Sequence, residues 1–317
     1  MNHSKEITDG ALLTALYIIL LLIGIFTPFI IIIMLFVLPI PIVVYAARYS
    51  WKPTLLMLFV ILLFSLLIVP IISIPLTVLT SVGGLMIGTA IFQKRSAYET
   101  WARGTIGFVV GILFLFFFSQ FILQVNWSQE IDMVIQDSIE MTEAIVTQFG
   151  MEEEMGDQLQ LIEQQMYTFK DLLPASIAML SIFLAIICQW LSYKVMNRVE
   201  KRKLSFPPFK KLNFPISIIW IYLIAMILSL LTLDPNSTIY LVVINTFVLT
   251  SLFIIIQGFS FIFFFADLKK IHKVLPISIV IISLLIPQIF LVLIRIIGII
   301  DIGFSLKTKL ENGKPSS

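Results

Sequence analysis

Nine long apolar runs constrain this 317-residue chain more than any other feature, because eight of them contain no charged side chain. A run of about 20 apolar residues matches the hydrocarbon thickness of a bilayer. Only 13% of the residues are charged, against about 25% in an ordinary soluble domain. The sequence therefore predicts an all-α fold, a polytopic transmembrane helix bundle with about nine spans in the cell membrane. The predicted spans are residues 10–26, 28–46, 54–71, 74–92, 104–124, 174–193, 215–232, 239–265 and 275–300.

The connections between these runs suggest how the chain is organised. The first run follows a polar stretch and has no small-residue cleavage site after it, which indicates a retained helix and not a signal peptide. Pro28, and the prolines at both ends of 70–75, predict very tight turns after the first and third spans. We divide the chain into residues 1–124 with helices one to five, 125–173 as an acidic helical insert, 174–304 with helices six to nine, and 305–317 as a polar tail.

Basic residues report the orientation, because cytoplasmic connections carry an excess of lysine and arginine. With a cytoplasmic amino terminus, nearly all of them fall inside and residues 125–173 are extracytoplasmic, with Lys170 as the one cation outside. The last run conflicts with this scheme, since a ninth crossing would place Lys307 and Lys309 outside. Pro287 interrupts that run. We expect one tilted, Pro-kinked crossing with a short external tail, and a partly re-entrant run is the alternative.

The external insert is the one sizeable polar segment. Between residues 125 and 171 it has eleven acidic residues and one lysine, a net charge of −10. Two apolar stripes at helical spacing predict an amphipathic helical hairpin that breaks at Gly150, with a cap at Asn126 and Gln129. Such a hairpin is either a lid or partner-docking element, or a packed hairpin with a solvated acidic face. The second stripe is Met155, Leu159, Ile162, Met166 and Phe169.

Catalytic and cofactor motifs are missing from the sequence. It has no phosphate-binding loop, no zinc-protease or serine-hydrolase signature and no paired cysteines. Cys188 lies in an apolar run, and His3 and His272 have no ligand set nearby. We therefore expect no enzyme activity, no catalytic residue, no cofactor and no metal. The net charge of +2 gives no reason to expect nucleic acid as a partner.

Polar side chains inside the spans are candidates for binding a solute, because leaving them exposed to lipid is unfavourable. They bind a ligand or join helices by hydrogen bonds. The candidates are Gln120, Gln124, Gln189, Asn245, Gln257, Gln288 and Arg295. Small residues at helical spacing are a second group, and they predict close packing of helices or contact with another subunit. These are Gly10, Ala11, Ala15, Gly84, Gly88, Gly107 and Gly111.

Three segments carry a resemblance to a known family: residues 9–16 (DGALLTAL), 205–209 (SFPPF) and 213–215 (NFP). Together with the Pro-broken hairpins, they resemble the YybS-like family of uncharacterised bacterial membrane proteins over nearly the whole chain. That family is similar, over its first six helices, to the substrate-binding S subunits of energy-coupling-factor transporters. In S subunits a small-residue face on the first helix packs on a coupling subunit, which implies that role for Ala11 and Ala15. The acidic insert and three further helices depart from that pattern.

Two functions are compatible with the sequence. The first is a transporter-like membrane subunit that binds a solute or couples to other membrane subunits. The alternative is a structural or regulatory scaffold that binds protein partners, and an intramembrane enzyme would lack paired acid and base groups. The lipid bilayer is a partner in every case. A solute site should gather polar side chains around an outward-opening cavity, whereas a scaffold should have them hydrogen-bonded to neighbouring helices.

Overall fold

The structure is a computed structural model, and it is all-α. It describes residues 3–69, 71, 73–150, 152–231, 234 and 237–312, and these contain no β-strand. The chain divides into two compact units, Met1–Phe206 and Pro207–Ser317. We call them the amino-terminal and carboxyl-terminal units and describe each by itself.

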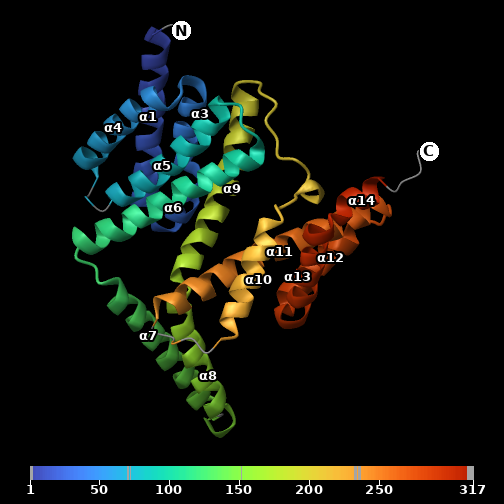
Figure 1. The fold of residues 1–317 in the computed structure, drawn as a ribbon. Coiled ribbons are helices and arrows are strands. Elements are labelled where there is room, and N and C mark those ends of the chain that lie inside the picture. Colours follow the sequence, from blue (N-terminus) through green and yellow to red (C-terminus); the bar gives the residue numbers. More distant parts are fainter. Residues whose placement is uncertain are drawn as a thin grey trace. The chain divides into compact units, whose positions relative to one another are not determined.

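The amino-terminal unit contains the first six predicted spans and the polar insert (Figure 1). Its helices follow the predicted apolar runs. A short 3-10 turn η1 lies at Pro28–Ile30. A second break lies before Pro39, because proline has no backbone N–H to donate to the preceding turn of the helix. The helices are α1 His3–Phe26, α2 Ile31–Val37, α3 Pro39–Tyr49, α4 Trp51–Ile68, α5 Ser73–Phe92, α6 Ala97–Phe121, α7 Trp127–Gln148, α8 Glu152–Asp171 and α9 Leu173–Val199.

Helix α5 forms the centre of this unit, packed between α3 and α6. Glycines make the close approach possible. A Cβ added at Gly84 would lie 2.9 Å from the Pro39 carbonyl oxygen of α3, and one added at Gly111 of α6 would lie 2.7 Å from the Cα of Leu79. Helices that approach so closely gain dispersion contacts that lipid does not provide.

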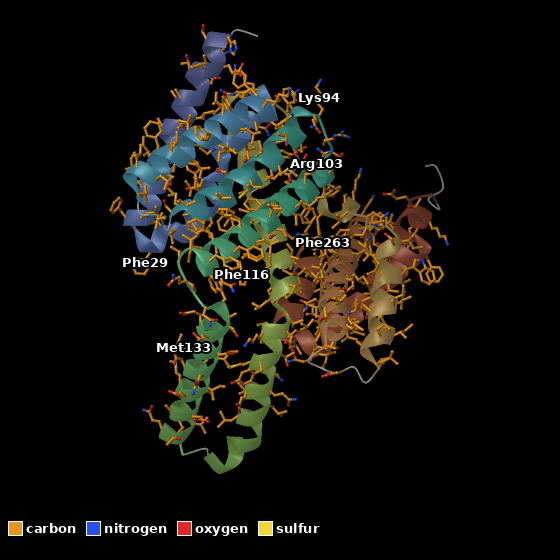
Figure 2. The ribbon with its side chains drawn as sticks, turned by 60° about the vertical axis from the view of Figure 1, so that its left-hand side comes forward. Phe29, Lys94, Arg103, Phe116, Met133 and Phe263 are labelled. Atoms are coloured by element: carbon orange, nitrogen blue, oxygen red, sulfur yellow. The ribbon has the colours of Figure 1, made fainter. Side chains whose placement is uncertain are left out.

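The two ends of the amino-terminal unit differ in charge. At one end Arg48 donates to the carboxylates of Asp9, at 2.8 Å, and Glu200, at 2.6 Å, which ties α1 and α3 to the end of α9. Lys94 and Arg103 lie at this end as well, and Met133 of the α7–α8 hairpin lies at the other (Figure 2). Because α9 starts where the hairpin ends, it runs from the hairpin to the basic end.

The carboxyl-terminal unit is built around α11, Thr238–Leu268, which packs against α10, Ser217–Ser229, and α13, Pro287–Phe304. A 3-10 turn η2 at Phe209–Lys211 precedes α10. The two remaining helices are α12, Val274–Leu285, and α14, Leu306–Asn312. Helices α11 and α13 cross where Gly258 and Gly298 face each other's backbone: a Cβ on Gly258 would clash with the Ile294 carbonyl oxygen, and one on Gly298 with the Ile254 carbonyl oxygen.

The predicted single crossing at the carboxyl end is wrong, because the run folds as a helical hairpin (Figure 1). Five residues separate the end of α11 from the start of α12. After α13, Lys307 returns to that end and donates to the hydroxyl of Ser260 on α11, at 2.7 Å. The chain reverses at Ile286, whose φ of −127° and ψ of 68° are not helical, just before Pro287. Residues 305–312 therefore lie at the same end of the carboxyl-terminal unit as the 269–273 turn.

Eight helices of the described chain are long and apolar enough to cross a membrane. They are α1, the α2–α3 pair, α4, α5, α6, α9, α11 and α13. The seventh predicted span corresponds to α10, which is shorter than the roughly 20 residues of a full crossing. The ninth corresponds to the α12–α13 hairpin, in which α12 has 12 residues, about 18 Å of helix.

Candidate functional site

The α7–α8 hairpin contains the polar insert, and its local structure follows the sequence signals. The Asn126 side chain caps α7 by accepting a hydrogen bond from the Gln129 amide at 3.3 Å. Gly150 separates the two helices with a φ of 67°, which favours glycine. We call the end of the hairpin next to α6 and α9 its foot. There, Trp127 stacks on Phe116 of α6 and its indole donates to the Ser119 hydroxyl at 2.8 Å. The hairpin is thereby anchored to the end of α6.

The inner face of the hairpin is only partly closed. On α7, Ile135 and Val146 are buried. On α8, the predicted stripe has its middle residues Leu159, Ile162 and Met166 half-buried. Phe169 is 66% exposed, and the side chain of Met155 lies outside the described residues. The stripe therefore faces α7 over its middle and opens at the foot.

A pocket of about 630 Å³ lies at that opening, between α7, α8 and the start of α9. Its volume falls within the range of about 300–1,000 Å³ that is typical of ligand sites. Val125 and Leu173 lie at the foot of the pocket, and the polar lining comes from Glu130, Ser138 and Lys170. The rest of the lining is apolar: Trp127, Ile131, Val134 and Ile135 from α7, and Met166 and Phe169 from α8.

The charges around the pocket are unbalanced. The Lys170 ammonium lies 2.8 Å from Asp132 and 3.1 Å from the Ser128 hydroxyl, so the single cation of the insert is already paired. In the part of the chain that the structure describes, Glu130 and Asp137 make no ion pair or hydrogen bond through their carboxylates. The pocket is thus an apolar cavity beside uncompensated negative charge.

Most of the predicted solute-binding residues lie apart from one another. Gln120 and Gln124 are exposed at the end of α6 and just after it, and Gln124 precedes the pocket residue Val125. In the carboxyl-terminal unit Gln288 is exposed, and the Asn245 side chain donates to the Leu241 carbonyl of its own helix at 2.8 Å.

Arg295 is half-buried near the ring of Phe247, with its guanidinium carbon 6.0 Å from the ring centre. Its Nε atom has no hydrogen-bond partner among the described residues. Arg295 forms no ion pair with Asp301, whose carboxylate contacts Lys307 and Gln257.

The two deeply buried glutamines join helices within each unit. In the amino-terminal unit, the amide of Gln189 donates to the Ala97 carbonyl at 2.9 Å and to the Tyr193 hydroxyl at 2.8 Å. In the carboxyl-terminal unit, Gln257 donates to Asn213 at 3.1 Å and accepts from the Phe214 amide at 3.1 Å. None of the seven candidate residues lines the described pocket.

Gln257 also donates to a carboxylate that was not among the predicted site residues. Asp301, on α13, is 1% exposed and accepts from Gln257 at 2.5 Å. Its partner is Lys307, whose ammonium lies 3.4 Å from the carboxylate and donates to the Leu212 carbonyl at 2.7 Å. Burial lowers the pKa of Lys307, and the Asp301 carboxylate acts in the opposite direction. The sequence signal that could have indicated this pair is a single acidic residue just after an apolar run, Asp301, followed within a few residues by Lys307 and Lys309.

Comparison with known proteins agrees with the fold class. A family model described as "Predicted membrane protein (DUF2232)" matches residues 15–302. The chain belongs to this family. It is similar to the "Uncharacterized protein YybS" of Bacillus subtilis (strain 168), with 28% identity over 318 residues that cover 98% of this chain and 100% of the relative. No solved structure matches it, so similarity to the S subunits stays a prediction.

The small residues of this family member lie mainly against its own helices. A Cβ at Gly10 would meet the Tyr45 ring, and one at Gly88 would lie 2.7 Å from the Val43 carbonyl of α3. Gly84 lies against α3 as well, and Gly107 and Gly111 lie against α5. Ala11 and Ala15 differ, because both are exposed on α1. A partner-binding role for these two alanines stays a prediction.

Proposed function

We propose that this chain is a non-catalytic membrane scaffold that binds a protein partner through its α7–α8 hairpin. The observation that carries the proposal is the pocket of about 630 Å³ at the foot of the hairpin, with its mainly apolar lining. In a polar, acidic element, an apolar cavity of this size beside exposed apolar side chains is a recognition surface.

The buried polar residues favour a partner-binding scaffold over a transporter-like subunit. Gln257 both donates and accepts within the protein, as a helix-joining residue does. Gln189 donates twice within its unit, and its Oε1 is buried without a hydrogen-bond partner among the described residues. The other candidates are distributed over different helices and surround no described cavity. A transporter-like subunit that binds its solute elsewhere, or couples to other subunits, is the second candidate, and the exposed Ala11 and Ala15 favour it.

The proposal places the hairpin outside the cell. The basic end of the amino-terminal unit, with Arg48, Lys94 and Arg103, takes the cytoplasmic side under the positive-inside rule. The hairpin lies at the opposite end of that unit and is therefore extracytoplasmic. The partner is then a membrane protein with an external segment, or an external protein.

The experiment is affinity purification from native membranes, with the wild type beside Met141→Glu and Glu143→Gln. Met141 is exposed on α7, and Glu143 lies on the other side of the same helix. We expect a co-purifying protein that is lost with Met141→Glu and kept with Glu143→Gln. Identical co-purifying proteins in all three samples would contradict the proposal, and a co-purifying ATPase pair in all three would favour the transporter-like subunit.

A further inference from the structure

Helix α7 presents a second apolar stripe, which borders the pocket at the foot of the hairpin and is exposed from there toward the tip. Its residues alternate by four and three positions, the spacing of a coiled-coil interface. We call this stripe the seam: Trp127, Ile131, Val134, Ser138, Met141 and Ile145. Three of its members are well exposed, Val134 at 63%, Met141 at 69% and Ile145 at 47%. The seam is therefore an apolar face without a described partner.

The seam and the pocket form one surface. The first four seam residues line the pocket, and Met141 and Ile145 continue the same helical face toward the tip. The buried residues Ile135 and Val146 lie on the neighbouring face, against α8. From Trp127 to Ile145 the seam extends over about 27 Å of helix. A surface of this length, with an open pocket at its foot, has the shape that receives a helix.

Acidic residues flank the seam on the side away from α8. Glu130 and Asp137 each immediately precede a seam residue, so they hold the position that forms interhelical ion pairs in coiled coils. Neither carboxylate has an ion-pair partner among the described residues. They are seven residues apart, two helical turns on one edge of the seam.

We infer that the seam binds a cationic amphipathic helix of another protein, with apolar side chains on the seam and lysine or arginine opposite Glu130 and Asp137. This inference rests on the proposed function and specifies its partner. The geometry provides the apolar contact, and the charge of −10 over residues 125–171 provides the preference for a cation.

The same charge argues against the other occupants of such a face. A second copy of the hairpin would bring another charge of −10 against the first, with one lysine in each. Anionic headgroups would be repelled for the same reason, so the seam is poorly suited to lie on a membrane. A cationic helix is the occupant whose charge and apolar face both match.

The test is site-specific photo-crosslinking in cells, with p-benzoylphenylalanine at Met141 and, as the matched control, at Glu143. The cross-linked peptide is identified by mass spectrometry. We expect a Met141-specific adduct to a basic amphipathic segment, and a reduction of its yield by about tenfold when Glu130→Lys and Asp137→Lys are combined. Reversing the lysines of the identified segment to glutamate should restore the yield.

The outcomes separate this inference from the proposed function. An adduct to a segment that is acidic or not amphipathic, or one unaffected by the charge reversal, overturns the cationic helix and leaves a docking hairpin. An adduct to a second copy of this chain overturns the cationic helix in favour of self-association. Equal labelling from Met141 and Glu143, with no discrete adduct, overturns both.

Discussion

Two polar regions of this protein, the Asp301–Lys307 cluster and the foot of the α7–α8 hairpin, differ in how completely their groups are paired. In the first, the Asp301 carboxylate and the Lys307 ammonium are buried and contact each other. The carboxylate also accepts from Gln257, and the ammonium donates to the Leu212 carbonyl. In the second, Glu130 has no described partner and apolar side chains border an open pocket. Satisfied groups hold helices together, whereas unsatisfied groups beside exposed apolar surface are available for binding.

The largest effect on stability should follow removal of one member of the buried pair. Asp301→Ala leaves the Lys307 ammonium without its countercharge, which should destabilise the protein by about 3–5 kcal/mol. The thermal midpoint of the purified protein in detergent measures this loss. Asp301→Asn combined with Lys307→Met should recover much of it, and Lys309→Ala, an exposed neighbour, is the control. Equal midpoints for Asp301→Ala and Lys309→Ala would show that the pair is not structural.

The second largest loss of stability should follow replacement of a core residue of the hairpin. Ile135, on the face toward α8, is 7% exposed, whereas Val134, the preceding residue and a member of the seam, is 63% exposed. Ile135→Ala should destabilise the hairpin by about 2–4 kcal/mol, and Val134→Ala should change its stability by less than about 0.5 kcal/mol. Hydrogen exchange of the α7 amides reports both. Similar losses for the two variants would mean that the seam is packed against this chain.

A smaller effect is expected where α11 and α13 cross. Gly258→Ala places a Cβ against the Ile294 carbonyl and should destabilise the protein by about 1–3 kcal/mol, because the backbones must separate. Gly303→Ala is the matched control, since its Cβ would lie 3.7 Å from the nearest atom, an ordinary contact. If both variants melt at the wild-type temperature, α11 and α13 do not cross at these glycines.

The smallest effect should come from Lys170. Its ion pair with Asp132 is at the surface, with the two side chains 33% and 44% exposed. Lys170→Gln should therefore reduce stability by less than about 1 kcal/mol. It should also strengthen the binding of a cationic partner, because Asp132 becomes free. Cross-linking yield from Met141 measures the second effect, and a lower yield would argue that Lys170 itself contacts the partner.

Much of the fold could be predicted because bilayer thickness and helical periodicity leave strong signals. Every predicted apolar run contains a helix, Gly150 breaks the hairpin, and Asn126 caps α7 as expected. The reversal at Ile286 could not be predicted from Pro287 alone, because a proline kinks a helix or ends it according to its tertiary contacts. The anchor of Asp301 and Lys307 to Gln257 and Ser260 joins residues that are more than 40 positions apart.

The candidate site was less predictable for a related reason. Polar residues in spans were expected to bind, but whether a glutamine is satisfied depends on neighbours such as Ala97 and Asn213, which only the fold brings close. The amphipathic stripe of α7 was visible in the sequence. That stripe includes Ile135 but not Val134, and the exposed stripe through Val134 was not predicted, because the side of α7 that stays open depends on how α8 packs.

The central claim, that a cationic partner covers the seam outside the cell, is tested most directly by cysteine accessibility. Met141→Cys and Glu143→Cys are placed in a Cys188→Ala background and labelled with a membrane-impermeant maleimide in intact cells. In about 1 M salt, where the screening length is about 3 Å, the ion pairs of the partner with Glu130 and Asp137 are screened and its binding weakens. We predict that Glu143→Cys reacts equally at physiological and high salt, and that Met141→Cys is protected at physiological salt and becomes more reactive at high salt. Equal, rapid labelling of both cysteines under both conditions would contradict the claim.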